Sequence, residues 1–176
     1  MRKFLFTLLL VATIGSTSFS QFGIKAGYSM GILANKTPNK AKIQPGFQIG
    51  VNWISENTRF DVVVEPWFPK DSVQMSLTPI TLGYDYVFRD AVLRPFIGLN
   101  FGLYWERRAE EVYGNIIVNG EPYFGLYPKV GIDYEITYNL YLDVTAKYHI
   151  LFDLGVEKAK NPHYFGLAVG LTYRFG

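Results

Sequence analysis

The sequence predicts an all-β fold, an eight-stranded antiparallel up-and-down transmembrane β-barrel. Three observations lead to it: segments in which apolar residues alternate with small or polar ones, connections that alternate between short and long, and an apolar face too large to fit inside a barrel. Alternation with a period of two indicates strands whose two faces meet different surroundings. No stretch carries a helical period, so helices are not expected in the folded domain.

The N-terminus has the layout of a secretory signal peptide. Arg2 and Lys3 form a basic start, residues 4–14 an apolar run, and residues 18–20 a small-x-small cleavage site. The apolar run is far shorter than the roughly 20 residues that a membrane-spanning helix needs. We therefore expect a signal peptide over residues 1–20, cleaved before Gln21; the alternative is a buried N-terminal helix.

Residues 21–176 are expected to form one outer-membrane β-barrel domain. The chain has no cysteine, which excludes a lipid-anchored N-terminus, a disulfide framework and a thiolate metal site. Export removes Arg2 and Lys3 and no acidic residue, which leaves 15 basic and 15 acidic residues. A chain without net charge offers no electrostatic case for binding nucleic acid.

Eight segments carry the two-residue alternation, and their connections alternate in length. The predicted strands are residues 22–32, 47–54, 59–68, 80–88, 93–105, 123–136, 140–150 and 164–175. Short polar links fall at residues 55–58, 89–91 and 137–139, and longer ones at 33–46, 69–75, 106–122 and 151–163. A membrane barrel with both termini in the periplasm has short turns there and longer loops outside. The loop over residues 106–122 can extend as a hairpin that turns at Asn119-Gly120.

Prolines and one change of phase interrupt the alternation. Pro66, Pro95 and Pro128 lie within predicted strands, and each lacks the N–H that a β-ladder uses. Residues 75–78 are out of phase with the strand that follows them. We therefore expect a β-bulge near Pro79 and irregular pairing near Pro128.

Size decides which face lies inside. The interior of an eight-stranded barrel is only just wide enough for side chains to fill it, or to hold one small ligand, so the many large rings of the apolar face do not fit there. The other face holds the strand glycines: Gly23, Gly27, Gly31, Gly50, Gly83, Gly98, Gly102, Gly125, Gly131, Gly166 and Gly170. The glycine face is predicted to line the lumen, and the apolar face to meet lipid rather than to bind a ligand as in a lipocalin-like barrel.

The predicted lumen face carries charges of both signs in equal number. The twelve residues are Lys25, Arg59, Arg94, Lys129, Lys147 and Arg174 with Asp61, Glu65, Asp85, Asp133, Glu135 and Asp143. Balanced charge in a narrow lumen favours ion pairs that plug the interior over an open aqueous pore. The candidate lumen charge network comprises Lys25, Asp61, Glu65, Asp85, Arg94, Lys129, Asp133, Asp143 and Lys147. Arg59, Glu135 and Arg174 could instead lie at the rim in water.

The two ends of the predicted lipid face are rich in rings, as expected of interfacial aromatic girdles. The predicted periplasmic girdle consists of Trp53, Phe60, Phe88, Tyr134, Tyr173 and Phe175. The predicted outer girdle consists of Tyr28, Phe68, Trp105, Phe124, Tyr148 and Phe165.

Two parts of the sequence carry a resemblance to a known family. The ending GLTYRFG resembles the signal by which outer-membrane barrels are recognised by the insertion machinery. The block PITLGYDYVF, followed after a short turn by LRPFIGLNFG, resembles the central hairpin of the outer membrane protein beta-barrel domain (porin-like) family, itself similar to OmpA- and OmpX-type eight-stranded barrels. The resemblance spans residues 21–176. It implies the fold, the outer membrane of a Gram-negative cell, and contact with outer-membrane lipid, lipopolysaccharide and the barrel insertion machinery.

The chain has two histidines, His149 and His163. A lipid-A-modifying barrel hydrolase would need a hydroxyl nucleophile beside a base that a carboxylate orients. The conceivable partners are Ser29, Ser72, Ser76, Glu65 and Glu157, but no spacing selects them. We therefore predict structural histidines and no catalytic residue. The sequence shows no metal-ligand cluster, phosphate-binding glycine loop or cofactor motif, so neither a metal nor a cofactor is predicted.

The first long loop carries Lys36, Lys40 and Lys42 and no acidic residue. These side chains could contact the anionic phosphates of lipopolysaccharide, or the segment could be a solvated loop. The predicted function is that of a non-enzymatic integral outer-membrane barrel that contributes to envelope structure, surface interaction or assembly, with a monomer expected. The alternatives are a narrow pore for small solutes, a lipid-A-modifying barrel enzyme and an accessory subunit of a secretion system.

Overall fold

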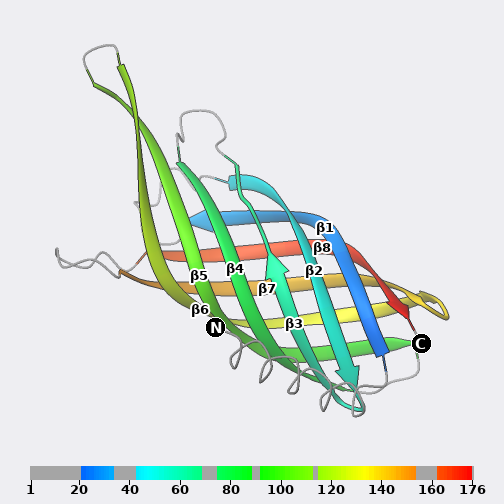
Figure 1. Ribbon diagram of the computed structural model, residues 1–176. Helices are drawn as coiled ribbons and strands as arrows, with labels where there is room; N and C mark the ends of the chain where they lie inside the picture. The colour runs from blue at the N-terminus through cyan, green and yellow to red at the C-terminus, as the bar shows by residue number, and fades with distance from the viewer. Residues whose placement is uncertain are drawn as a thin grey trace, which may run out of the picture.

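A computed structural model describes residues 21–33, 43–68, 75–88, 92–112, 115–153 and 162–175. These residues form a closed barrel of antiparallel strands in sequence order (Figure 1), which confirms the predicted fold class. No helix among them is long and apolar enough to cross a membrane. The predicted signal peptide and the three lysines of the first long loop lie outside the described residues.

The eight strands differ mainly in length. They are β1 (Gln21–Leu33), β2 (Ile43–Ser55), β3 (Thr58–Val64), β4 (Met75–Val87), β5 (Leu93–Val112), β6 (Asn115–Thr137), β7 (Leu140–Asp153) and β8 (His163–Phe175). β1 closes the barrel by pairing with β8, from Phe22 opposite Phe175 to Leu33 opposite Tyr164. Closure pairs the backbone groups of the two terminal strands, which would otherwise form unpaired edges.

Short turns and the two termini of the barrel share one end, which we call the turn end; the opposite end is the loop end. At the turn end, Ser55 pairs with Thr58 around a two-residue turn. Glu56 in this turn has a φ of 46°, in the left-handed region that such turns use. The Thr58 hydroxyl donates a hydrogen bond of 2.8 Å to the carbonyl oxygen of Ser55 and holds the turn closed.

The bulge predicted near Pro79 is wrong. β4 pairs with β5 in an unbroken register from Met75 opposite Arg108 to Val87 opposite Phe96. Leu77 therefore lies on the inward face, where it is fully buried. Its apparent change of phase reflects an apolar part of the lumen rather than a slip of the strand.

β3 is shorter than predicted because Pro66 has no N–H to continue the ladder. The chain then forms isolated bridges at Trp67, which lies between Gly46 on β2 and Leu77 on β4. The Trp67 amide donates to the Leu77 carbonyl at 2.8 Å, and the Leu77 amide donates back at 3.2 Å. Trp67 is thereby fixed at the base of the connection between β3 and β4.

Pairing between β6 and β7 is interrupted beside Pro128, as the missing proline N–H predicts. The ladder passes from Leu126 opposite Ile150 to Lys129 opposite Lys147 without pairing the residues between them. A second irregularity, a register shift between Glu135 and Thr137, was not predicted.

β5 and β6 continue as a hairpin beyond the other strands (Figure 1). Their pairing runs on to Val112 opposite Asn115, so the predicted turn at Asn119-Gly120 is wrong. Gly120 instead lies opposite Arg107 within the ladder. The register set in the barrel wall continues the pairing of β5 with β6 past this dipeptide.

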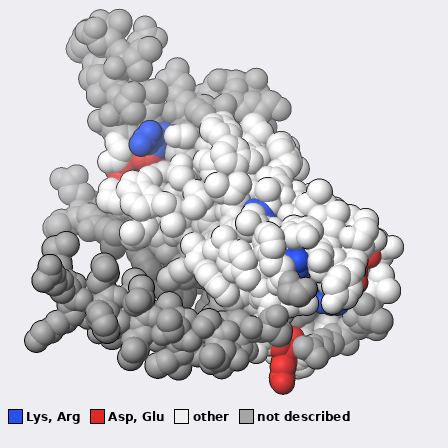
Figure 2. Space-filling model, turned by 45° about the vertical axis from the view of Figure 1, so that its right-hand side comes forward, with Lys and Arg blue, Asp and Glu red and all other residues white. Residues whose placement is uncertain are grey.

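The outward face is apolar and the inward face is buried. Many large apolar side chains on the outward face are 36–53% exposed, while others, such as Trp53 and Leu126, are partly buried. Figure 2 shows this surface from one side, with described atoms that are mostly uncharged. Most strand glycines face inward, where side chains or the backbone of neighbouring strands take the space in front of them. The structure thus has the two-faced strands that the alternation predicts.

Candidate functional site: the barrel lumen

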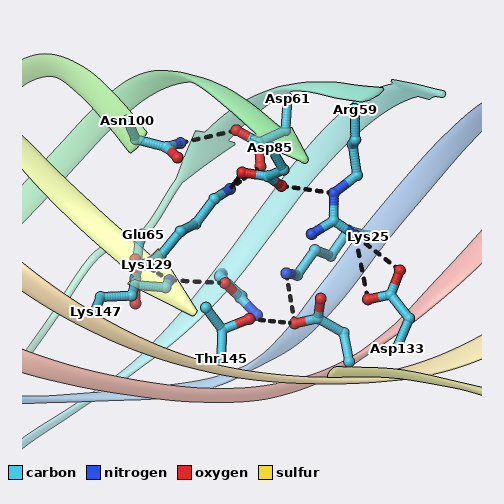
Figure 3. Close-up of polar contacts among 12 residues, drawn as sticks. Lys25, Arg59, Asp61, Glu65, Asp85, Asn100, Lys129, Asp133, Thr145 and Lys147 are labelled. Carbon is cyan, nitrogen blue, oxygen red and sulfur yellow. Dashed lines mark hydrogen bonds and ion pairs between the residues drawn. The ribbon is translucent and has the colours of Figure 1, made fainter. Parts of the chain in front are cut away.

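The lumen is filled by side chains that pair across it. The twelve charges predicted to face inward all belong to ion pairs, and ten of them are at most 8% exposed. Glu106 on β5 is a further buried charge that was not among those predicted. We call these twelve residues the charge network, and Figure 3 shows its central part. Its members come from every strand except β2, together with the residue that follows β3, so the network ties distant parts of the wall together.

The centre of the network lies around Lys129 on β6. Its ammonium group pairs with Asp61 on β3 and, at 2.9 Å, with Asp85 on β4. Asp61 also accepts a hydrogen bond of 2.8 Å from the amide of Asn100 on β5. One buried cation therefore bridges two carboxylates supplied by different strands, and Asp85 also pairs with Arg59 Nε at 2.7 Å.

Two guanidinium groups share one carboxylate nearer the turn end. Arg59 Nη1 and Arg174 Nη2 lie 2.8 Å and 2.6 Å from Asp133 Oδ2. Arg59 stacks on the ring of Phe96 at 4.1 Å, and Arg174 on Tyr141 at 3.6 Å. Arg59 and Arg174 are 2% and 1% exposed, so the alternative that placed them at the rim in water is wrong.

The pair of Arg94 and Glu135 marks the mouth of the lumen at the turn end. Arg94 Nη2 lies 2.8 Å from Glu135 Oε2, and their side chains are 26% and 23% exposed. Glu135 therefore lies at the rim, as the alternative for this residue predicted. Water screens this pair more than the pairs deeper in the lumen.

Two further pairs join β7 to parts of the wall that do not neighbour it. Lys25 on β1 lies 2.6 Å from Asp143, which also accepts a hydrogen bond from Thr145. Lys147 lies 2.7 Å from Glu65, the residue that follows β3. These contacts anchor β7, which takes no part in the ion pairs of Lys129.

A cluster of rings closes the lumen towards the loop end. Its members, which we call the aromatic cluster, are Trp67, Leu77, Tyr104, Tyr123, Tyr127, Leu151 and Tyr164, with His149 in contact with three of its rings. This cluster was not predicted, because the large rings of the sequence were assigned to the lipid face. The signal lay in tyrosines such as Tyr104 and Tyr164, which share the parity of the inward glycines on β5 and β8.

Trp67 is fully buried in this cluster and fits against two glycines. A Cβ atom built on Gly31 or on Gly46 would lie 2.5 Å from the Trp67 ring. The indole Nε1 donates to Glu65 Oε1 at 3.3 Å. The aromatic cluster and the charge network therefore meet at Glu65, and together they fill the lumen.

The two histidines occupy different places. His149 is fully buried and shares a hydrogen bond of 2.9 Å between its Nδ1 and the Tyr104 hydroxyl. His163 is the first residue of β8 and stacks on Tyr148 at 5.7 Å. Within the described part of the chain, no serine hydroxyl is hydrogen-bonded to either ring.

The conceivable partners of a hydrolytic triad are not assembled. Glu65 bonds to Lys147 and Trp67, Ser29 lies on β1 and Ser76 on β4, while Ser72 and Glu157 lie outside the described residues. Among the residues of the described ranges, no group of three or more His, Asp or Glu side chains could hold a metal ion.

The comparisons with known proteins agree with a barrel of this kind. Residues 7–175 match the model of the family described as "Outer membrane protein beta-barrel domain". The chain belongs to this family. Its fold is that of an outer-membrane barrel, and membership implies a location in the outer membrane. No curated protein matches the chain.

Solved structures share the fold at low sequence identity. Neisserial surface protein A is 20% identical over 88% of this chain and 97% of its own, with a TM-score of 0.66. The attachment invasion locus protein Ail of Yersinia pestis is 15% identical over 88% and 98%, with a TM-score of 0.60. Outer membrane protein H of P. aeruginosa is 16% identical over 86% and 99%, with a TM-score of 0.54. The chain thus spans nearly the full length of each.

Proposed function

We propose that this protein is a non-enzymatic outer-membrane barrel with a closed lumen, which contributes to envelope structure and surface contacts rather than to solute passage. The observation that carries the proposal is the filling of the lumen by paired charges and packed rings. Ten of the twelve charges are at most 8% exposed, and Trp67, Tyr104 and Leu77 are fully buried. A filled eight-stranded barrel leaves the outer surfaces and loops as the parts that can meet partners.

Swelling of reconstituted liposomes tests the closed lumen against the pore. We expect liposomes that contain the folded protein to swell in sugars and amino acids no faster than empty liposomes. The unboiled protein must migrate differently from the boiled protein on a gel, which shows that it entered the membrane folded. Rapid swelling with folded protein would reject the proposal in favour of a narrow pore.

The environment of His149 supports the absence of catalysis. A general base must reach the proton that it abstracts, and this ring is enclosed by Trp67, Tyr104 and Tyr127. Mass spectrometry of lipid A checks this point in cells with the wild-type gene, with the gene deleted and with His149→Ala. We expect the same lipid A species in all three strains; a species that disappears in both the deletion and the variant would indicate an enzyme.

The proposed partner at the outer surface is lipopolysaccharide, contacted by Lys36, Lys40 and Lys42. The support is the run of three lysines without an acid in a predicted outer loop. Binding of labelled lipopolysaccharide to the purified protein should fall in the triple Lys→Gln variant and weaken with added salt. Unchanged binding in the triple variant would show that these lysines do not bind lipopolysaccharide.

A further inference from the structure

His149 stands among rings at the loop end of the lumen. Its ring centroid lies 4.4 Å from Tyr127, 5.0 Å from Trp67 and 5.8 Å from Tyr104. The ring is fully buried, and its Nδ1 shares a hydrogen bond of 2.9 Å with the Tyr104 hydroxyl. Nε2 has no hydrogen-bond partner within the described ranges. A Cβ built on Gly166 would lie 3.0 Å from Nε2, so the wall of β8 closely covers this atom.

The charged and titratable groups near His149 come from five parts of the barrel. They are Glu65 from the connection after β3, Tyr104 and Glu106 from β5, Tyr123 and Tyr127 from β6, Lys147 from its own β7, and Tyr164 from β8. Both oxygens of Glu65 are engaged, Oε2 by Lys147 at 2.7 Å and Oε1 by Trp67 at 3.3 Å. The Glu106 carboxylate accepts from the Tyr164 hydroxyl at 3.5 Å.

A proton on both nitrogens of His149 would therefore add a second buried cation two residues from Lys147. Glu65 already balances Lys147, and within the described ranges no carboxylate is hydrogen-bonded to Nε2. A buried charge without a partner is strongly unfavourable, so acid favours a conformation in which water reaches the protonated ring. Histidine is the residue whose charge changes between about pH 5 and 8.

We propose that His149 makes the loop-end closure of the lumen sensitive to acid. Protonation moves the imidazole out of the aromatic cluster, and the rings that pack on it separate. Trp67 is the ring best placed to report this separation. It contacts His149 directly and lies just beyond the end of β3, at the base of the connection between β3 and β4. This inference goes beyond the proposed function, since it gives the closed lumen a condition under which its outer end opens.

Fluorescence of Trp67 tests the proposal directly. The chain has three tryptophans, so Trp53→Phe and Trp105→Phe together leave Trp67 as the sole reporter. Quenching by acrylamide is measured on the protein in detergent micelles from about pH 7.5 down to about pH 4, which extends below the range in which an exposed histidine titrates. We expect weak quenching at neutral pH and a reversible, several-fold rise in the quenching constant with acid.

Two histidine variants provide matched controls. His149→Gln retains a side chain that can bond to Tyr104 but does not titrate, so its quenching should stay low at all pH values. His163→Gln changes the other histidine, which lies at the end of β8 against Tyr148, and should keep the acid-dependent rise. The difference in gel mobility between unboiled and boiled samples shows that each variant is folded. If His149→Gln does not fold, His149→Phe, which keeps a ring in the cluster, takes its place.

Either of two results would overturn the proposal. The first is quenching that stays constant with pH in the protein that carries Trp67 alone. The second is an acid-dependent rise that persists in a folded variant without His149, because the buried carboxylates would then be responsible.

Discussion

Inside this barrel, several large or charged residues lie against a glycine, and each cation pairs with a carboxylate. Where an inward residue is large or charged, as with Trp67, Tyr104 or Asp61, a glycine on a neighbouring strand makes room for it. Each inward cation forms an ion pair with a carboxylate from another strand. Parity alone assigns these twelve charges to the inward face, because a strand directs alternate side chains to one face. It could not assign their partners, since these depend on the stagger between strands.

Lys129→Met tests the centre of the charge network. The change leaves Asp61 and Asp85 buried with one cation fewer, and removal of one partner of a buried ion pair costs roughly 3–5 kcal/mol. Arg94→Met is the matched control, because the pair of Arg94 with Glu135 is partly exposed and such pairs contribute about 0–1 kcal/mol. Urea unfolding in lipid vesicles measures both. Equal losses in the two variants would show that burial does not set the strength of these pairs.

Gly31→Ala tests the fit of Trp67 in the aromatic cluster. The added Cβ would lie 2.5 Å from the indole ring, so Trp67 or the strand must move. Overpacking of this kind costs about 1–3 kcal/mol. Gly120→Ala is the control, because the nearest atom to its Cβ is the Glu106 carbonyl oxygen at 3.9 Å. Unfolding measurements that find both variants as stable as the wild type would mean that the lumen is loosely packed at this point.

At the scale of the strand, alternation predicted the position and the faces of all eight elements, but not their ends. Pro66 ended β3 early because the chain needs an N–H there, while Pro79 was accommodated on an inward position of β4. The pattern around Leu77 suggested a bulge because an apolar residue at an inward position looks, in the sequence, like a shift of the strand by one residue. The hairpin of β5 and β6 passed the favourable Asn119-Gly120 dipeptide because long-range register outweighs a local turn preference.

Leu99→Arg tests the outward face of β5. Leu99 lies on the apolar surface and is 49% exposed. A basic residue near the middle of a bilayer costs a barrel roughly 2–4 kcal/mol, and the cost falls to about 0–1 kcal/mol near the interface. Tyr138→Arg, in the exposed turn between β6 and β7, is therefore expected to have little effect. The free energy of unfolding in vesicles is measured for both variants. A small loss of stability in Leu99→Arg would indicate that this surface is exposed to water rather than to lipid.

At the scale of the molecule, the barrel joins two kinds of filling in one lumen. The charge network occupies the turn end and centre, and the aromatic cluster closes the loop end. Fold and lumen face could be predicted because an eight-stranded barrel has no room for the large apolar face. The aromatic cluster was not predicted because the large rings were assigned to the lipid face as a class, although parity places Tyr104 and Tyr164 with the inward glycines of β5 and β8.

Single-channel recording in planar lipid bilayers at neutral pH tests the closed lumen most directly. Folded protein, verified by its gel mobility before and after heating, is inserted into the bilayer and the current is followed under an applied voltage. The filled lumen predicts insertion without steady current steps, because paired charges and packed rings occupy the described part of the lumen. Uniform, long-lived current steps that appear with each insertion would contradict the closed lumen.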